Sequence, residues 1–416
     1  MLCLANLRLY GIDQGSDQAA MVMIVGIFFY TVGYILAYAV RSKKVYTKNT
    51  NSLLYTENRA INGNRNFNKY VVVAALIFVS VYSIFRLYLT YRLLRAGYSY
   101  TQIRAVYFND AVLSDDVGAR AGRNRLDVYL FYPLIQLLIF ISCIVFFNET
   151  KVPQKKKTIF LLIAFACVGL TTFSNGGRDI IYFSVVIFLF CYELSRKGKK
   201  REGSDRRRIS KKQRRLLILI LAAAIIAIIV MTFRRSKTGE NSLQSLMRTV
   251  YLYFTGWVPH FSIRLNDVSS TDYTYGYAFS LGLFKFFAAG LHRLLGIPTS
   301  RLYSMAEAIT SNLQTRVSIG GGNRFNAFVS LFYYFYCDGG YLGVIIESFI
   351  FGLFCASVEK RYKKNPTNQN LLLYLFALYL IISSIVRWEM IHPKTAMMVY
   401  FFPLLYERKR SLKLSI

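Results

Sequence analysis

The chain has 416 residues, of which 54% are hydrophobic and 18% charged, and its formal net charge is +31. A mean hydropathy of +0.34 excludes an ordinary soluble protein with a single core. Runs of about 20 nearly uncharged residues recur, which is the length that crosses the hydrocarbon core of a bilayer. We therefore expect an all-α polytopic integral membrane protein. The six cysteines show neither metal-ligand nor disulfide spacing.

The apolar runs predict nine spans in chain order. They lie at residues 20–40, 70–91, 128–147, 158–174, 180–194, 216–233, 340–358, 370–386 and 395–406. The segment before the first span lacks the apolar core and cleavage site of a secretory signal peptide. Two further stretches, 278–298 and 324–337, would raise the count to eleven if both cross. Because 278–298 carries Lys285, His292 and Arg293, we expect a re-entrant or interfacial helix there.

Two segments of the carboxyl-terminal half carry other helix signals. Residues 323–358 are too long for one straight span, and Asp338-Gly339-Gly340 predicts a break in the helix. Backbone without helical structure at membrane depth needs surrounding protein or a wet cavity. Upstream, apolar residues recur at helical spacing from Leu243 to Phe254, which predicts an amphipathic helix in the outer interface.

Basic loops orient the chain, because lysine and arginine collect on the cytoplasmic side. Lysine and arginine are frequent in 41–69, 149–157, 196–215, 359–369 and the tail from Glu407. Alternation through nine spans places these segments inside, and the turn at Gly176-Gly177, 234–339 and 387–394 outside. The run 196–215 has no interleaved aromatics, so we expect no nucleic-acid partner.

The expected organisation is a single multi-span membrane domain over 1–416. Its external loops are 92–127 and 234–339, the latter with interfacial and re-entrant helices, and 196–215 is a basic cytoplasmic loop.

Arginine and lysine are distributed differently across this predicted topology. The cytoplasmic segments hold 13 Arg and 18 Lys, whereas 18 Arg and only 3 Lys remain in or outside the membrane. Guanidinium is weakly hydrated and binds phosphate or carboxylate through two parallel hydrogen bonds. We therefore expect an anionic substrate at the outer face. Pairing with external carboxylates or lipid phosphates would account for part of the excess, but not for Arg86, Arg178 and Arg387 at the ends of spans.

Motifs for nucleotides and metals are missing. The sequence has no GxGxxG after a strand, no GxxxxGK[ST], no HExxH and no Asp-x-Asp pair. An enzyme that works outside the cell needs a donor already activated within the membrane, and a polyprenyl-diphosphate-linked sugar fits. We expect no cofactor and no metal.

Three segments of the sequence resemble those of a known protein family. They are TTFSNGGRDIIYF (171–183), in which Gly-Arg separates two spans, RAGYSYTQIRAVYFND (95–110) after the second span, and NRFNAFVSLFYYFYCDGGYLGVIIESFIFG (323–352). Their order and topology resemble the Wzy-type oligosaccharide repeat-unit polymerases of O-antigen and capsule pathways, from about Leu7 to Tyr406. Relatives often have another span before a segment like LRLYG (7–11), so the printed chain can begin one span late.

The resemblance implies an activity. It implies inverting, nucleotide-independent glycosyl transfer at the outer face of a bacterial cytoplasmic (inner) membrane, within a GT-C-like bundle of about nine to eleven transmembrane helices. The polymer on undecaprenyl diphosphate would be transferred to the distal sugar of an incoming lipid-linked repeat unit, giving O-antigen or capsular or exopolysaccharide. Expected partners are this lipid-linked oligosaccharide, the lipid bilayer, and a chain-length regulator and flippase of the same pathway.

The resemblance also implies roles for single residues. Arg178 matches the Gly-Arg position and is the first candidate to bind the departing diphosphate, with Arg324 and Arg387 second. The base that activates the acceptor hydroxyl is a hypothesis: Glu389 or His392, with Asp338 as the third candidate.

A further group of arginines is Arg120, Arg123 and Arg125. They either hold a sugar or phosphate or form an exposed interfacial patch.

Two other functions remain open at this point. An O-antigen ligase would use similar chemistry with a different acceptor. Loss of a ligase leaves no repeats attached, whereas loss of a polymerase leaves single repeats. A lipid-linked oligosaccharide flippase needs polar groups along a path through the bilayer and usually has paired repeats. The spans between 128 and 174 carry no charge at depth, and no internal repeat is evident.

Overall fold

The computed structural model describes most of the chain and is helical almost throughout. The described residues are 7–40, 67–100, 102–104, 125–149, 152–177, 179–201, 215, 218–220, 222, 226, 242–296, 298–326 and 328–406. Six helical stretches among them are long and apolar enough to cross a membrane. The chain is therefore an all-α, multi-pass membrane protein.

The chain divides into two compact units. One takes residues 1–48, 225–360 and 376–396, and the other takes 49–224, 361–375 and 397–416. We call them the first and the second unit. Helices α15 (Leu331–Lys364), α16 (Asn368–Ser383) and α17 (Pro393–Phe401) contribute residues to both.

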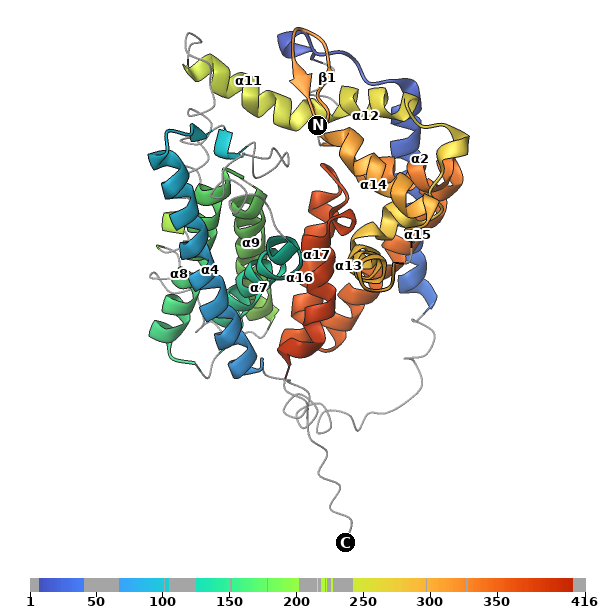
Figure 1. The fold of residues 1–416 in the computed structure, drawn as a ribbon. Coiled ribbons are helices and arrows are strands. Elements are labelled where there is room, and N and C mark those ends of the chain that lie inside the picture. The colour runs from blue at the N-terminus through green and yellow to red at the C-terminus, as the bar shows by residue number, and fades with distance from the viewer. Residues whose placement is uncertain are drawn as a thin grey trace. The chain divides into compact units, whose positions relative to one another are not determined.

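The second unit is built around one buried helix, α7 (Tyr132–Asn148). It follows directly on a π-helical turn, η3 (Asp127–Phe131). Since α7 is apolar around its whole circumference, it is buried on all sides. It contacts α4 (Lys69–Arg95), α8 (Gln154–Asn175) and α9 (Asp179–Arg201), which lie beside it in Figure 1. The 3-10 turn η6 (Phe402–Leu405) contacts α4.

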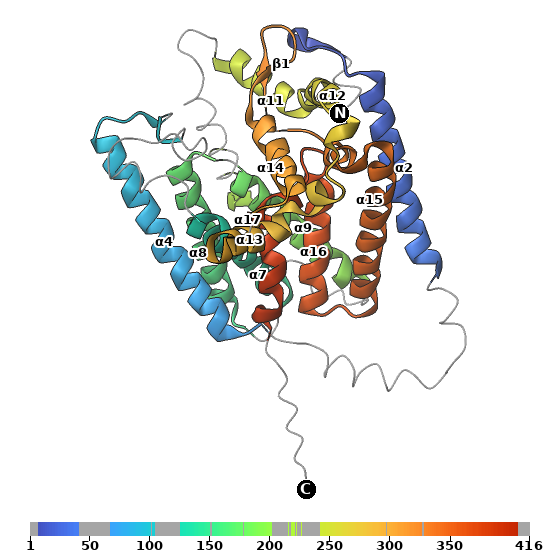
Figure 2. The same ribbon diagram turned by 45° about the vertical axis from the view of Figure 1, so that its right-hand side comes forward.

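In the first unit, α2 (Asp17–Val40) lies along α15, as Figure 2 shows. Small residues at their contact let the two backbones approach closely. A Cβ on Gly33 would lie 2.3 Å from the carbonyl oxygen of Phe349, and a Cβ on Gly352 would lie 2.1 Å from that of Tyr30. This contact tolerates no side chain on either glycine. At the far end, the hydroxyl of Tyr34 donates to Glu359.

The first unit also contains further helices, 3-10 turns and two short strands. They are η1 (Leu9–Gly11), α11 (Ser242–Thr255), α12 (Trp257–Asn266), η4 (Ser270–Asp272), α13 (Tyr277–Leu295), α14 (Arg301–Gln314), β1 (Val317–Ser318), β2 (Arg324–Phe325) and η5 (Glu389–Ile391). The strands pair antiparallel, with Val317 opposite Phe325 and Ser318 opposite Arg324. They are the only strands among the described residues.

The structure confirms most of the predicted helices. Helices lie at eight of the nine expected spans, namely α2, α4, α7, α8, α9, α15, α16 and α17. Of these, α2, α4, α7, α8 and α15 are long and apolar enough to cross a membrane, so the predicted number of spans stays a prediction. The expected span at 216–233 lies largely outside the described residues. The predicted helix over 243–254 is α11, and its apolar side chains Met247, Val250 and Phe254 are exposed. Its position at the outer interface stays a prediction.

The predicted break in α15 is also confirmed. Gly339 and Gly340 leave helical geometry, with φ/ψ of −177°/34° and 60°/−141°. The helical part before the break, 331–338, is only about 12 Å long and fails to cross a bilayer by itself. Residues 277–295 form one continuous helix, α13, and its Lys285 pairs with Glu307 of α14 at 2.7 Å. By length and composition the stretch Ser270–Leu295 is long enough to cross.

Candidate functional site

The Gly-Gly turn of the second unit closes the carboxyl-terminal end of α8. Gly176 caps the helix in the left-handed region at φ 67°. The side-chain oxygen of Asn175 accepts a hydrogen bond from the N–H of Gly177 at 2.7 Å, and its amide donates to the hydroxyl of Tyr132. This network fixes the start of the turn. Arg178, the next residue, lies outside the described residues.

A buried ion pair lies in the same unit. The guanidinium of Arg86 on α4 lies 3.7 Å from the carboxylate of Asp127 at the start of η3, and both side chains are buried. The expectation that pairing with a carboxylate would not account for Arg86 was therefore wrong. Arg125, two residues earlier, is exposed, and the other two members of that arginine group, Arg120 and Arg123, lie outside the described residues.

Arg324 lies on the β-hairpin of the first unit. Its side chain is exposed, and among the described residues it has no ion pair or hydrogen bond. The neighbouring Asn323 is buried and accepts two hydrogen bonds from the guanidinium of Arg248, at 2.9 and 2.7 Å. No contact of the described residues connects Arg324 to the other predicted site residues.

Asp338 caps the amino terminus of α13. One carboxylate oxygen accepts from the N–H of Ala278 at 2.9 Å and from the hydroxyl of Thr274, and the other accepts from the N–H of Phe279 at 2.7 Å. The first turn of a helix has free N–H groups and a positive dipole end, so a carboxylate stabilises it. Both oxygens of Asp338 are therefore engaged at the start of this helix.

The loop 387–392 packs on the same end of α13. The indole N–H of Trp388 donates to the carbonyl oxygen of Phe279 at 2.7 Å, and the two rings stack at 5.3 Å. A Cβ on Gly282 would lie 2.3 Å from the carbonyl oxygen of Met390 and 2.9 Å from that of His392. Only glycine allows this approach. Helix α13 thus brings Asp338, Glu389, His392 and Arg387 into one assembly.

Glu389 is the centre of this assembly. Its carboxylate accepts from Nε of Arg387 at 2.5 Å and from the hydroxyl of Thr395 at 3.1 Å, and it is only 3% exposed. Burial raises the pKa of Glu389, but the electrostatic effect of Arg387, Lys394 and His392 outweighs it and lowers the pKa to about 2. The carboxylate is therefore ionised at every physiological pH.

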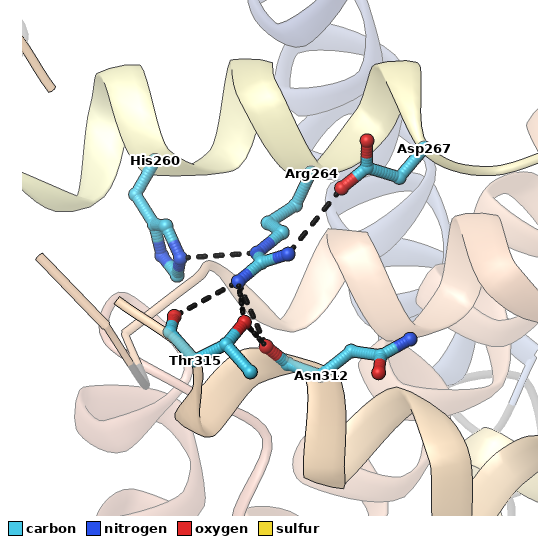
Figure 3. A network of polar contacts seen from close by, with 5 residues as sticks. All are labelled: His260, Arg264, Asp267, Asn312 and Thr315. Carbon is cyan, nitrogen blue, oxygen red and sulfur yellow. Dashed lines mark hydrogen bonds and ion pairs between the residues drawn. The ribbon is translucent and has the colours of Figure 1, made fainter. Parts of the chain in front are cut away.

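Arg264 forms a separate network in the first unit (Figure 3). From α12 it donates to the carbonyl oxygens of Asn312 and Thr315 at 2.7 and 2.9 Å, and to Nε2 of His260 at 3.3 Å. Nδ1 of His260 lies 2.8 Å from the carbonyl oxygen of Phe328, which identifies the neutral tautomer with the proton on Nδ1. Burial lowers the pKa of His260. This network joins α12 to α14 and is structural.

The comparison with known families decides the identity. Residues 7–406 match the family described as O-antigen polysaccharide polymerase Wzy. The chain belongs to the Wzy family. No curated protein and no solved structure matches it significantly. The family match covers nearly the whole chain and confirms the predicted family.

Wzy polymerases join O-antigen repeat units, and this chain is a glycosyltransferase-type polymerase that acts on lipid-linked oligosaccharide repeat units in a membrane. No finding favours a ligase or a flippase. Among the described residues, no three His, Cys, Asp or Glu side chains come together to hold a metal ion. Within the described residues, this Wzy chain brings Arg387, Lys394 and His392 close to the buried carboxylate of Glu389.

Proposed function

We propose that this Wzy polymerase is an inverting, nucleotide-independent glycosyltransferase at the outer face of the bacterial cytoplasmic membrane. The hydroxyl of the acceptor's distal sugar attacks the anomeric carbon of the polymer. The bond from that carbon to the diphosphate oxygen breaks, and the electron pair leaves with undecaprenyl diphosphate. The hydroxyl proton passes to a base. The observation that carries this proposal is the group of basic side chains, Arg387, Lys394 and His392, beside the buried carboxylate of Glu389.

Charge builds on the diphosphate as it leaves, so preorganised donors aimed at it lower the barrier. One such donor is typically worth about 2.7–4 kcal/mol. Glu389 binds Nε of Arg387 and thereby fixes the plane of the guanidinium, whose side chain is 19% exposed. Lys394, 8% exposed, adds a second positive charge. We assign Arg387 to the departing diphosphate and Lys394 to its support.

The base is assigned by comparing three candidates. Glu389, with a pKa of about 2 and both oxygens engaged, is a weak base, since an effective general base titrates near the working pH. Asp338 is engaged by the amino terminus of α13. His392 is half-buried and lies beside Glu389. We propose His392 as the base, with Glu389 and Asp338 positioning the groups around it.

Arg178 remains the first candidate from the sequence for the diphosphate. Its place after a glycine turn between two spans supports a role at a membrane surface, and a lysine there would keep the charge but lose the two parallel hydrogen bonds. Arg178→Lys should abolish long chains without lowering the protein level. Normal polymer from this variant would exclude the role. Arg324 and the group of Arg120, Arg123 and Arg125 are proposed contacts to sugar or phosphate.

The proposal also covers the helix bundle around the site and the proteins of the same pathway. We propose a GT-C-like bundle of nine to eleven spans that works with the flippase and the chain-length regulator of its pathway. We propose that its donor arrives from the bilayer already activated, so that no nucleotide takes part, and that the basic side chains of the site take the place of a metal ion.

The experiment uses the purified chain with a defined undecaprenyl-diphosphate repeat unit, without nucleotide and with EDTA. We expect a ladder of products and inverted configuration at each new linkage. Arg387→Gln, in the same detergent, serves as the comparison with strongly reduced turnover. A requirement for a nucleotide sugar, or retained configuration, would contradict the proposal.

A further inference from the structure

A groove of about 520 Å³ lies between α13 and α14 in the first unit. It follows one face of α13 from Tyr277 to Leu291, which is about 21 Å of helix. Tyr303 of α14 is buried, whereas Tyr275 before α13 is 71% exposed at the edge of the groove. The aromatic rings of the lining are those of Tyr275, Tyr277, Phe284, Phe287 and Tyr303. The groove is open and offers flat apolar faces along its length.

The groove is lined without charge. Among the described residues that line it, all are aromatic, aliphatic, glycine or hydroxyl-bearing. Lys285 and Glu307, on the same two helices, pair with each other at 2.7 Å. A diphosphate in the groove would lose its hydration without gaining a cation, which is costly. The lining therefore fits an uncharged ligand.

Hydroxyl groups lie at both ends of the groove. Tyr275, Tyr277 and Ser280 are at the start of α13, and Thr299 and Ser300 directly precede α14. Within the part of the chain that the structure describes, the hydroxyls of Tyr275 and Tyr277 form no hydrogen bond. The hydroxyl of Ser300 accepts from a backbone N–H at 3.2 Å and can still donate. A hydrocarbon chain would leave these groups unpaired, whereas sugar hydroxyls both donate and accept and would pair with them.

The turn before α13 holds Tyr275 in place. Tyr275 lies in the left-handed region at φ 49°, which costs energy for a bulky residue. Its N–H donates to the carbonyl oxygen of Asp338 at 2.9 Å, and the hydroxyl of Thr274 donates to the carboxylate of Asp338. Asp338 also caps α13 in the assembly described above. The end of the groove that carries the two tyrosines is thus continuous with the candidate site.

The groove and the proposed reacting centre lie on different sides of α13. The loop 387–392 contacts this helix at Phe279 and Gly282. At 100° per residue, these positions are nearly opposite the groove positions Phe284 and Leu291. A helix with its side chains is about 10–12 Å across, so a ligand that reaches both sides is a chain of several sugars.

We propose that the groove between α13 and α14 binds uncharged sugars of the growing polymer, several sugars away from the carbon at which transfer occurs. The inference rests on the proposed function, because it takes the cluster around Glu389 as the reacting centre. The sugars of the acceptor lead to its own diphosphate, for which the groove has no cation. The sugars of the polymer lead away from the reacting diphosphate, so the polymer is the occupant that fits.

The test compares donors of different length with the purified chain. The donors are undecaprenyl diphosphate carrying one repeat unit or several, and the labelled acceptor is a repeat unit whose bond to the diphosphate is replaced by a carbon–carbon bond, so that it cannot act as donor. In the wild type the KM for the donor should fall as the donor lengthens. Tyr275→Phe with Tyr277→Phe removes both hydroxyls, and Ala288→Trp fills the groove. Each change should raise the KM for the long donor about fivefold or more, the combined effect expected of two neutral hydrogen bonds, and change kcat less than about twofold.

Binding of a lipid-free oligosaccharide supplies a readout without turnover. Several repeat units are released from the carrier by mild acid and titrated into the protein by calorimetry. The groove variants should bind this oligosaccharide about fivefold more weakly or worse. Tyr70→Phe and Ile77→Trp, at exposed positions of α4, are the matched controls and should bind like the wild type.

Groove variants that melt like the wild type and keep its oligosaccharide affinity and its dependence on donor length would overturn the inference and leave the proposed function intact. Weaker binding of undecaprenyl phosphate by these variants, with unchanged binding of the oligosaccharide, would show a lipid groove and overturn it as well. A raised KM for the acceptor alone would contradict the assignment to the polymer. A wild type that makes no polymer from the defined repeat unit would contradict the proposed function, and with it the inference.

Discussion

The ion pairs Arg86–Asp127 and Arg387–Glu389 use the same two kinds of side chain in different units. The first joins α4 to η3, with both groups buried and 3.7 Å apart. In the second, the carboxylate is buried but Arg387 remains 19% exposed, and Lys394 and His392 also act on Glu389. The first pair is buried on both sides, whereas the second is partly exposed and has two further basic side chains beside its carboxylate.

This difference suggests a structural role for the Arg86–Asp127 pair and a functional role for the Arg387–Glu389 pair. A buried pair stabilises little by itself but is costly to break, because the remaining charge stays buried. A carboxylate that faces several cations holds them in place and leaves net positive charge for an anion. We therefore expect substitutions in the first pair to reduce stability and substitutions in the second to reduce polymerisation.

The largest effect is expected from Asp127→Asn. It leaves Arg86 buried opposite a neutral side chain, so the free energy of unfolding should fall by about 3–5 kcal/mol. Thermal unfolding in detergent measures it. The double variant Arg86→Met with Asp127→Leu should recover most of the stability. Loss of polymer with unchanged unfolding in Asp127→Asn would place this pair in the reaction instead.

Arg387→Gln should reduce kcat about 10²–10³-fold with little change in melting temperature, because it removes a preorganised donor for the departing charge. The readouts are turnover of a defined repeat unit and the length ladder in cells, where single repeats should remain attached. Ladders of wild-type length would rule out the proposed role of Arg387.

Gly282→Ala should lower stability by about 1–3 kcal/mol and shorten chains, because a Cβ there would press on the backbone of Met390 and His392. The control is Gly290→Ala on the same helix, where a Cβ meets nothing within 4 Å. If both variants have the same stability and chain length, the close approach of α13 to the loop 387–392 is not needed for polymerisation.

Acidification should destabilise the protein through His260. Burial lowers its pKa in the folded state, so below the unfolded value of about 6.5 the unfolded chain binds more protons, and stability falls by up to about 1.4 kcal/mol per pH unit. Unfolding of the wild type and of His260→Gln between pH 8 and 5 measures the difference. A parallel pH dependence of the two proteins would show that His260 contributes nothing.

The smallest effect concerns Glu389. A lowered pKa stabilises the folded state fully above the unfolded value of about 4.3, and this contribution is lost only as the pH falls toward 2. The difference in unfolding free energy between wild type and Glu389→Gln should therefore stay constant from pH 8 to about 5. A change within that window would mean that Glu389 titrates near neutrality, as a base would.

Much of the fold could be predicted from the sequence, because apolar runs of membrane-spanning length are strong local signals. Asp338-Gly339-Gly340 predicted the break in α15. The order of three short segments predicted the family. Arg387 and Glu389 are two residues apart, so their pairing also had a local signal.

Other features depend on distant parts of the chain. The partner of Arg86 is 41 residues away at the start of a π-helical turn, and Asp338 caps a helix that begins about 60 residues earlier. Neither contact can be predicted from the spacing of these residues along the sequence. The engagement of Asp338 and the low pKa of Glu389 both follow from such packing, so the sequence alone could not distinguish Glu389 from His392 as the candidate base.

The most direct test compares leaving groups. Single-turnover transfer is measured with a polymer linked to undecaprenyl diphosphate and with the same polymer linked to undecaprenyl monophosphate, in wild type and in Arg387→Gln. If the cluster around Glu389 binds the departing diphosphate, the substitution should slow the diphosphate donor about 10²-fold or more and the monophosphate donor far less. Equal slowing of both donors would contradict that role.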